Sequence, residues 1–388
     1  MVQLPPEELE ARLRDFQKSL QQENLDAALI LQRIDLYYYS GTTYLHSLFI
    51  PADGAPLGLT RQELPYRPPW PTLRLTTSAD LGNVIASRLR EGALIGLEFD
   101  VLPVNQYQRL AAQLPAYRFA DASPLIRRQR ARKSAWELEV LRETARRDLA
   151  VWEALPTLVA GARTDLDLAA GLEALARRQG HQGLVKFRAF NEEIFFNVIL
   201  AGPAGAAGGP YDTPLSGRGV SPTFPQGASG VPLRPGEPIL VDYGGCYQGY
   251  VLDQTRLFAL GRLPFELRRV YDTARRIQDA VVQAARPGVT CGALYQLAAG
   301  LAEESGLLAY FMGPKRVPYI GHGVGLELDD WPVLAQGSGV KLEPGMVFAL
   351  EPKFAIPGQG AVGLENCFAV TATGLERLSP VADDPVIV

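Results

Sequence analysis

The sequence predicts an α+β protein, with an α/β layer in the first third and a larger unit of long helices and hairpins after it. In the first third, short apolar runs alternate with stretches of helical periodicity, which is typical of an α/β layer. The chain has 388 residues, of which 47% are hydrophobic and 21% charged. That composition excludes a disordered or collagen-like chain, and the length suggests two domains.

The elements of the first third follow from periodicity. A helix is predicted over residues 7–24, where apolar side chains recur at helical spacing (Leu9, Leu13, Phe16 and Leu20). Short apolar runs predict strands at 26–31, 45–51 and 93–98, and helical patterns occur near 79–90 and 104–114. Four prolines within 62–71 exclude regular structure there.

A basic run at residues 127–133 is interpreted as a solvated linker and sets the domain boundary, giving domains 1–130 and 131–388. Ser134 is a candidate cap for a long helix. Further helices are predicted near 165–179, 264–285 and 291–305, and strands at 194–200, 238–243, 249–258, 345–351 and 361–371. Residues 201–236 are rich in Gly, Pro and Ala, and a connection of that length usually lies beside a functional site.

Net charge and composition limit the kinds of binding partner and the cellular location that we expect. A net charge of −4 provides no basic field for nucleic acid or an anionic membrane surface. No apolar stretch approaches the roughly 18 residues of a membrane span. The acidic, amphipathic start lacks the layout of a secretory signal, and the three scattered cysteines suit no disulfide framework. We therefore expect a cytoplasmic protein.

Two glycine-rich hairpins carry paired carboxylates. If the first turn is centred on Tyr247–Gln248, Asp242 lies directly opposite Asp253. Like charges in that arrangement are destabilising, so a shared proton, an arginine or a metal cation must offset the repulsion. In the second hairpin, a turn centred on Gly358 places Glu351 opposite Glu365, because both are the same number of residues from the centre.

One such pair could be a coincidence of register. Two pairs in hydrophobic strands, with Arg256 the one other charge noted nearby, favour a shared cation site. His322 lies between the hairpins in sequence, flanked by glycines that let its backbone approach something closely. One imidazole and four carboxylates suit a pair of Mn²⁺, Co²⁺, Fe²⁺ or Zn²⁺ ions about 3.5–4 Å apart.

These residues resemble the "pita-bread" metallopeptidases, which include methionine aminopeptidase, aminopeptidase P, prolidase and the metal-free creatinase. The family's ligand order of Asp, Asp, His, Glu, Glu is matched by Asp242 in VDYG, Asp253 in GYVLDQTR, His322 in GHGVGLEL, Glu351 in ALEP and Glu365 in GLEN. Residues 132–142 are similar to that family's inter-domain helix start. The resemblance implies a creatinase/prolidase-like domain at 1–130 and a pita-bread metallohydrolase domain at 131–388.

The resemblance also implies a site and its partners. The five matched residues would bind two divalent ions, with manganese favoured over cobalt, zinc or iron, and Glu351 would be both ligand and proton relay. The substrate would be a small peptide or amide of the Xaa-Pro type. We expect a homodimer.

Four positions depart from the family pattern. The family carries a histidine after the long Gly-rich segment, where residues 206–211 have none. It carries others at the positions of Pro318 and Asp329, and an arginine at the position of Gly363. Imidazoles that steer the substrate are therefore missing, while the metal ligands are intact.

Three hypotheses remain open at this point. The chain is a prolidase-like or aminopeptidase P-like hydrolase, a hydrolase of a different amide or C–N bond, or an inactive homologue that binds metal or peptide. Asp329 is a candidate catalytic proton carrier, or with Asp330 part of a solvated turn. Tyr211 or Tyr319 could supply a hydroxyl donor. Loss of the histidines predicts weak or redirected activity, since each missing oxyanion donor typically costs about 10²–10³ in rate.

Overall fold

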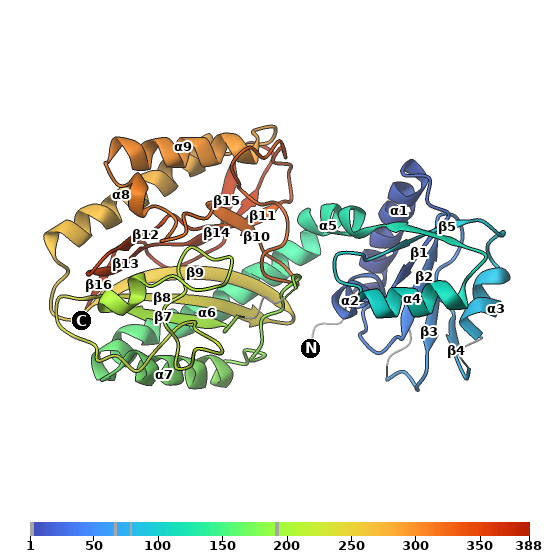
Figure 1. Ribbon diagram of the computed structural model, residues 1–388, viewed down its shortest axis with the longest axis horizontal. Helices are drawn as coiled ribbons and strands as arrows, with labels where there is room; N and C mark the ends of the chain where they lie inside the picture. The colour runs from blue at the N-terminus through green and yellow to red at the C-terminus, as the bar shows by residue number, and fades with distance from the viewer. Residues whose placement is uncertain (1–3, 66–67, 78–79, 191–193) are drawn as a thin grey trace. The chain divides into compact units, whose positions relative to one another are not determined.

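The computed structural model describes residues 4–65, 68–77, 80–190 and 194–388 (Figure 1). The chain divides into two compact units, Met1–Arg130 and Ala131–Val388. No helix in the described part of the chain combines the length and apolar character needed to cross a membrane.

The first unit is built on one mixed six-stranded sheet. Its strand order is β4 (Thr72–Arg74), β3 (Leu57–Thr60), β2 (Ser47–Pro51), β1 (Ala27–Ile30), β5 (Leu94–Leu97) and β6 (Arg118–Asp121). Its helices are α1 (Pro6–Gln22), α2 (Arg33–Ser40), α3 (Asp80–Ala86), α4 (Val104–Gln113) and α5 (Ser123–Ala131). The predicted α/β layer is confirmed. Sequence periodicity missed α2 and the short strands β3, β4 and β6.

The basic run at 127–133 is not a solvated linker. Most of it belongs to α5, and Arg130 is buried, where its guanidinium donates to Asp35 Oδ1 at 2.8 Å. Lys133 is also buried. The linker interpretation failed because an arginine paired with a carboxylate can be buried, which charge counting along the sequence does not reveal.

In its described residues, 131–190 and 194–388, the second unit contains four long helices and three groups of strands. The helices are α6 (Ala135–Gly161), α7 (Asp165–Arg178), α8 (Phe265–Ala284) and α9 (Cys291–Glu304). One sheet has the order β16 (Val386–Ile387), β9 (Tyr250–Ala259), β8 (Pro238–Tyr247), β7 (Asn197–Ala201). The other has the order β10 (Gly321–Gly323), β11 (Val347–Leu350), β14 (Asn366–Val370), β15 (Leu375–Arg377). A separate two-stranded ribbon consists of β12 (Lys353–Ile356) and β13 (Gly360–Gly363).

These strands lie between two pairs of helices (Figure 1). The predicted cap of α6 is confirmed, because Ser134 and Glu137 form a reciprocal capping box.

Along β8 the side chains alternate between two cores. Val241 packs in the core formed with α6 and α7, and Leu240 packs in the core formed with α8 and α9. Asp242 shares the inner face with Leu240, since alternate residues of a strand point the same way.

The long connection at 201–236 lies beside a pocket, as predicted. It begins with the short 3₁₀-helix Gly202–Ala206, and four of its residues line the pocket described below (Tyr211, Asp212, Thr213 and Gln226).

Candidate metal centre

The first hairpin brings Asp242 and Asp253 to one face in a register different from the one predicted. Asp242 pairs with Thr255, and Asp253 pairs with Gly244. The turn lies at Gln248 and Gly249, whose φ values of 54° and 86° suit a two-residue turn that requires positive φ at both positions. The two-residue shift leaves both carboxylates on the inner face as diagonal neighbours.

The second hairpin has the predicted register. Leu350 pairs with Asn366, and Lys353 pairs with Gly363, so Glu351 and Glu365 lie opposite one another between two ladder segments of equal register. Both glutamates are buried. A bridge between Thr255 and Glu365 joins this hairpin to the first one, and the Thr255 hydroxyl donates to Glu365 Oε2 at 2.8 Å.

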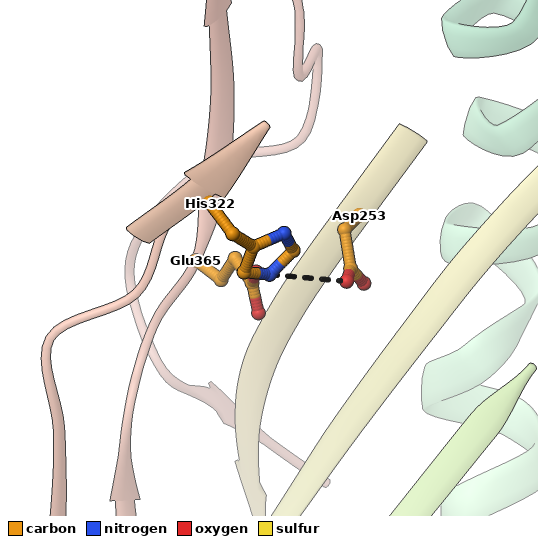
Figure 2. Close-up of side chains that lie close together, drawn as sticks. All are labelled: Asp253, His322 and Glu365. Carbon is orange, nitrogen blue, oxygen red and sulfur yellow. Dashed lines mark ion pairs between the residues drawn. The ribbon is translucent and has the colours of Figure 1, made fainter. Parts of the chain in front are cut away.

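His322 lies on β10 and completes the cluster. Its Nε2 is 3.9 Å from Asp253 Oδ2 and 3.8 Å from one carboxylate oxygen each of Glu351 and Glu365. Figure 2 shows three of these side chains turned toward one another. The opposite ring nitrogen, Nδ1, pairs with Asp329 Oδ1 at 2.9 Å.

The field of this cluster shifts its ionisable groups. Burial opposes a charged imidazole, yet the nearby carboxylates, Asp329 first, raise the pKa of His322 well above its usual value. Burial, assisted by Glu365 and Asp242, raises the pKa of Asp253 well above its usual value.

Lys353 was missed by the sequence analysis. Its side chain is 3% exposed, and Nζ donates to three carboxylates, Asp242 Oδ2 at 2.8 Å, Glu351 Oε2 at 2.9 Å and Glu365 Oε2 at 2.7 Å. Burial disfavours the ammonium, but the surrounding carboxylates, Asp242 first, outweigh it and raise the pKa of Lys353 well above its usual value. A lysine therefore supplies a cation that the carboxylates require.

A signal for this residue was present in the sequence. Lys353 is two residues from Glu351, and alternate residues of a strand share a face. Arg256, the charge that the sequence analysis did note, has a different task. Its NH1 donates to the main-chain oxygens of Thr255 and Glu365, and its NH2 donates to the Asn366 side chain. It holds the strands from behind and does not reach the carboxylate pairs.

Three of the donor residues are close enough to share one metal ion. Ligand atoms of Asp253, His322 and Glu365 all lie within 4.8 Å of one another. Glu365 Oε1 is buried without a hydrogen-bond partner, and it is the oxygen that faces His322 Nε2. An imidazole nitrogen and carboxylate oxygens suit a borderline divalent ion, so the residues on this side fit one. On the Asp242 side the Lys353 ammonium takes up the carboxylate oxygens.

A pocket opens onto this cluster. Its wall is largely apolar and aromatic (Val185, Phe187, Ile194, Phe195, Phe196, Val198, Tyr211 and Leu328). Asp242, Asp253, His322, Glu351 and Lys353 lie on its polar side, together with Asp329 and Tyr319. The Tyr319 hydroxyl donates to the main-chain oxygen of Asp212 at 2.7 Å, so this proton is engaged at the pocket edge.

His322 is the one histidine among the residues lining this pocket. His181, also in the second unit, is buried against Phe196, with Nε2 3.0 Å from the Gly244 main-chain oxygen and Nδ1 accepting from the Gly183 N–H. It supports the strand behind the cluster. Asp329 is partly buried against His322, and Asp330 is 2% exposed and accepts from the Trp331 N–H. The solvated-turn interpretation of this pair is therefore wrong.

The comparison with known proteins agrees with this arrangement. Residues 139–372 match the model of Metallopeptidase family M24, and residues 12–132 match that of the Creatinase/Prolidase N-terminal domain. The first match alone spans more than half of the chain. The chain belongs to metallopeptidase family M24. The expected fold, a creatinase-type first domain followed by a pita-bread domain, is confirmed.

Relatives align along most of the chain. It is 26% identical over 374 residues to the Xaa-Pro dipeptidase of Pyrococcus furiosus, covering 96% of this chain and 98% of the relative. It is 31% identical over 297 residues to the Xaa-Pro dipeptidase of Lactobacillus delbrueckii subsp. lactis, covering 76% and 73%. The crystal structure of dipeptidase PepE from Mycobacterium ulcerans superposes with a TM-score of 0.81 at 23% identity, covering 100% of both chains. This last similarity concerns the fold.

Proposed function

We propose that this M24 protein is a metal-dependent hydrolase of small peptides or amides related to Xaa-Pro dipeptides, with weak or redirected activity. The observation that carries the proposal is the grouping of Asp253, His322 and Glu365, whose ligand atoms lie within 4.8 Å of one another. Glu365 Oε1 is buried there without a hydrogen-bond partner, and the group lies at a pocket with an apolar wall. A divalent ion held by these residues supplies Lewis acidity toward a peptide carbonyl. Manganese is the favoured ion.

The remaining residues have distinct tasks in this proposal. Glu351 Oε1 faces His322, while Oε2 accepts from Lys353. Glu351 is therefore placed to hold an ion and to accept a proton from an attacking water. Asp329 fixes the ring of His322 through Nδ1 and acts as a positioning residue.

The proposed weakness of turnover rests on the absent donors. Pro318 and Gly363 cannot donate from their side chains, and the Asp329 carboxylate is committed to His322. The Tyr319 hydroxyl is engaged with Asp212. A bound tetrahedral species would therefore meet fewer donors than the resemblance implies for other members.

Lys353 favours a second candidate function, an inactive homologue that binds metal or peptide. Four clustered carboxylates without a cation would cost stability, which argues against losing the metal. Lys353 removes much of that cost, because its ammonium contacts three of the four. The carboxylates can therefore be retained without a bound metal, because the lysine offsets much of their mutual repulsion.

Measured turnover separates the two candidates. Hydrolysis of a set of Xaa-Pro dipeptides and tripeptides would be measured with and without added Mn²⁺. We expect slow, Mn²⁺-dependent cleavage that falls by at least about 100-fold in Glu351→Gln, which keeps the volume and loses the charge. Glu343→Gln, at an exposed residue, is the matched control and should match wild type.

Each result has a distinct meaning. Bound Mn²⁺ without cleavage of any of these substrates favours the binding function. Turnover comparable with ordinary peptidases would show that the missing histidines matter little. The expected homodimer and cytoplasmic location stay predictions, which sedimentation and cell fractionation can check.

A further inference from the structure

We propose that the Lys353 ammonium permanently occupies one of the two cation positions of this centre, so that the protein binds a single divalent ion, on the His322 side. The inference rests on the proposed metal site and adds its stoichiometry. It assigns to Lys353 the role of a built-in cation.

The Lys353 ammonium fills the position that an ion joining these carboxylates would take. An ammonium has three N–H donors, and here each donates to a different carboxylate, at 2.8, 2.9 and 2.7 Å. These are lengths of charge-assisted hydrogen bonds. A divalent ion that joined the same three carboxylates, at roughly 2.0–2.2 Å from their oxygens, would need the position that faces all three, and Nζ already fills it.

Gly363 lies directly opposite Lys353 in the β12–β13 ribbon. A Cβ at Gly363 would lie 2.7 Å from the Pro352 main-chain oxygen, 2.8 Å from Lys353 Cα and 2.9 Å from Lys353 Cγ, closer than real Cβ atoms approach such neighbours. Glycine is therefore required by the close approach of the two backbones, and it also leaves open the path of the first carbons of the Lys353 side chain.

The two sides of the centre differ in their free oxygens. Glu365 Oε2 accepts from both Thr255 and Lys353, while Oε1 has no partner and faces His322 Nε2. Glu351 is divided in the same way, with Oε2 on Lys353 and Oε1 toward His322. Both glutamates thus contact the Lys353 ammonium through one oxygen and direct the other toward His322 Nε2, where it is available to an ion.

Charge repulsion also disfavours a second ion. With all four carboxylates ionised and His322 neutral, as a metal ligand is, the Lys353 ammonium leaves three negative charges in the cluster. One divalent ion reduces this to a single negative charge, and two ions beside the ammonium would reverse its sign. The residual charge has the same size in both cases, so the deciding effect is that a second ion would meet the ammonium at close range.

The number of bound ions tests the proposal. Wild type, Lys353→Met and Lys353→Ala would be equilibrated with excess Mn²⁺, freed of unbound ion and analysed for manganese per chain. We expect one ion in wild type and two in both variants, since each variant removes the charge and methionine keeps most of the volume. Lys341→Met, at an exposed lysine, should stay at one.

Two ions in wild type, or one in a folded Lys353→Met protein, would overturn the proposal. No manganese in any of these proteins would overturn the metal site of the proposed function as well, so the two failures are distinguishable. Anomalous scattering from wild-type crystals grown with Mn²⁺ provides a test that needs no variant. One peak within bonding distance of His322 Nε2 supports the inference, and a second beside Asp242 contradicts it.

Discussion

The His322 ring is held at Nδ1 and presents Nε2 to the carboxylates. Asp329 Oδ1 pairs with Nδ1 at 2.9 Å, and the carboxylates of the cluster surround Nε2 at 3.8–3.9 Å. A carboxylate on one ring nitrogen selects the tautomer and orientation that present the other nitrogen to a metal. The aspartate at this position thus orients the ligand. It does not reproduce the donor that the resemblance places there.

Replacing Asp329 should therefore weaken metal binding. We expect Asp329→Ala to raise the Kd for Mn²⁺ by about 10–100-fold, the usual effect of losing a partner of a metal-bound histidine. Asp329→His should also weaken binding, because the new imidazole cannot replace the carboxylate. Calorimetric titration with Mn²⁺ measures both, with Asp384→Ala at an exposed residue as the control. An unchanged Kd in Asp329→Ala would show that the pairing does not orient His322.

At the scale of residues, sequence reasoning identified five side chains that the structure brings together and missed the lysine whose ammonium contacts three of them. The convergence was predictable because face and register follow from the period of two along a strand. Lys353 was not identified, although its spacing from Glu351 places both on one face, because the predicted strand ended at residue 351 and a lysine is ordinarily solvated.

The two hairpins show how far register can be predicted at the scale of elements. In the second, Gly358 marks the centre of the turn, and the predicted pairing of Glu351 with Glu365 is confirmed by the ladders on either side. In the first, several adjacent glycines made the centre ambiguous, and the pairing was shifted by two residues. An even shift preserves the face, so Asp242 and Asp253 still face the same core.

The glycines around His322 serve the packing of β10. A Cβ at Gly323 would overlap the main-chain oxygen of Trp331, and one at Gly321 would overlap that of Ala349. The close approach predicted from the sequence is therefore to the protein's own backbone. At Gly325 a Cβ would meet only the Lys133 side chain, with Cε at 3.1 Å.

This difference predicts unequal effects of alanine. Gly323→Ala should lower the free energy of unfolding by about 3 kcal/mol, because the backbone must shift to relieve the overlap. Gly325→Ala should cost less than about 1 kcal/mol, since a lysine side chain can move aside. Urea denaturation of both variants measures the difference. Equal losses would mean that β10 is free to move.

At the scale of the whole molecule, the fold class followed from the sequence, while the pairing of distant strands did not. The centre draws on β8 and β9, on β10 and on the β11–β14 hairpin, so its assembly depends on contacts between segments far apart in the chain. Strands of three or four residues such as β10 and β12 are too short for periodicity to show them. Their positions come from the sheets that they join.

Asp148 links α6 to the sheet in the interior of the second unit. Its carboxylate is fully buried, it accepts from Gln254 Nε2 at 3.4 Å, and its Oδ1 has no hydrogen-bond partner. Gly245 on β8 provides the space, since a Cβ there would overlap this carboxylate. Burial raises the pKa of Asp148 well above its usual value, although Tyr243 and Gln254 oppose the shift by hydrogen bonding.

The buried carboxyl makes global stability depend on pH. An unfolded Asp titrates near pH ~4, and the folded Asp148 titrates higher, so between the two the folded state binds more protons. Its contribution to the free energy of unfolding therefore decreases as pH rises through that window. Asp148→Asn cannot titrate, so its stability relative to wild type should rise steadily from pH 4 to pH 7. Urea denaturation at several pH values measures this, with Asp279→Asn at an exposed site as the control. A difference that stays constant or falls with pH would contradict the burial of an ionisable carboxyl at this position.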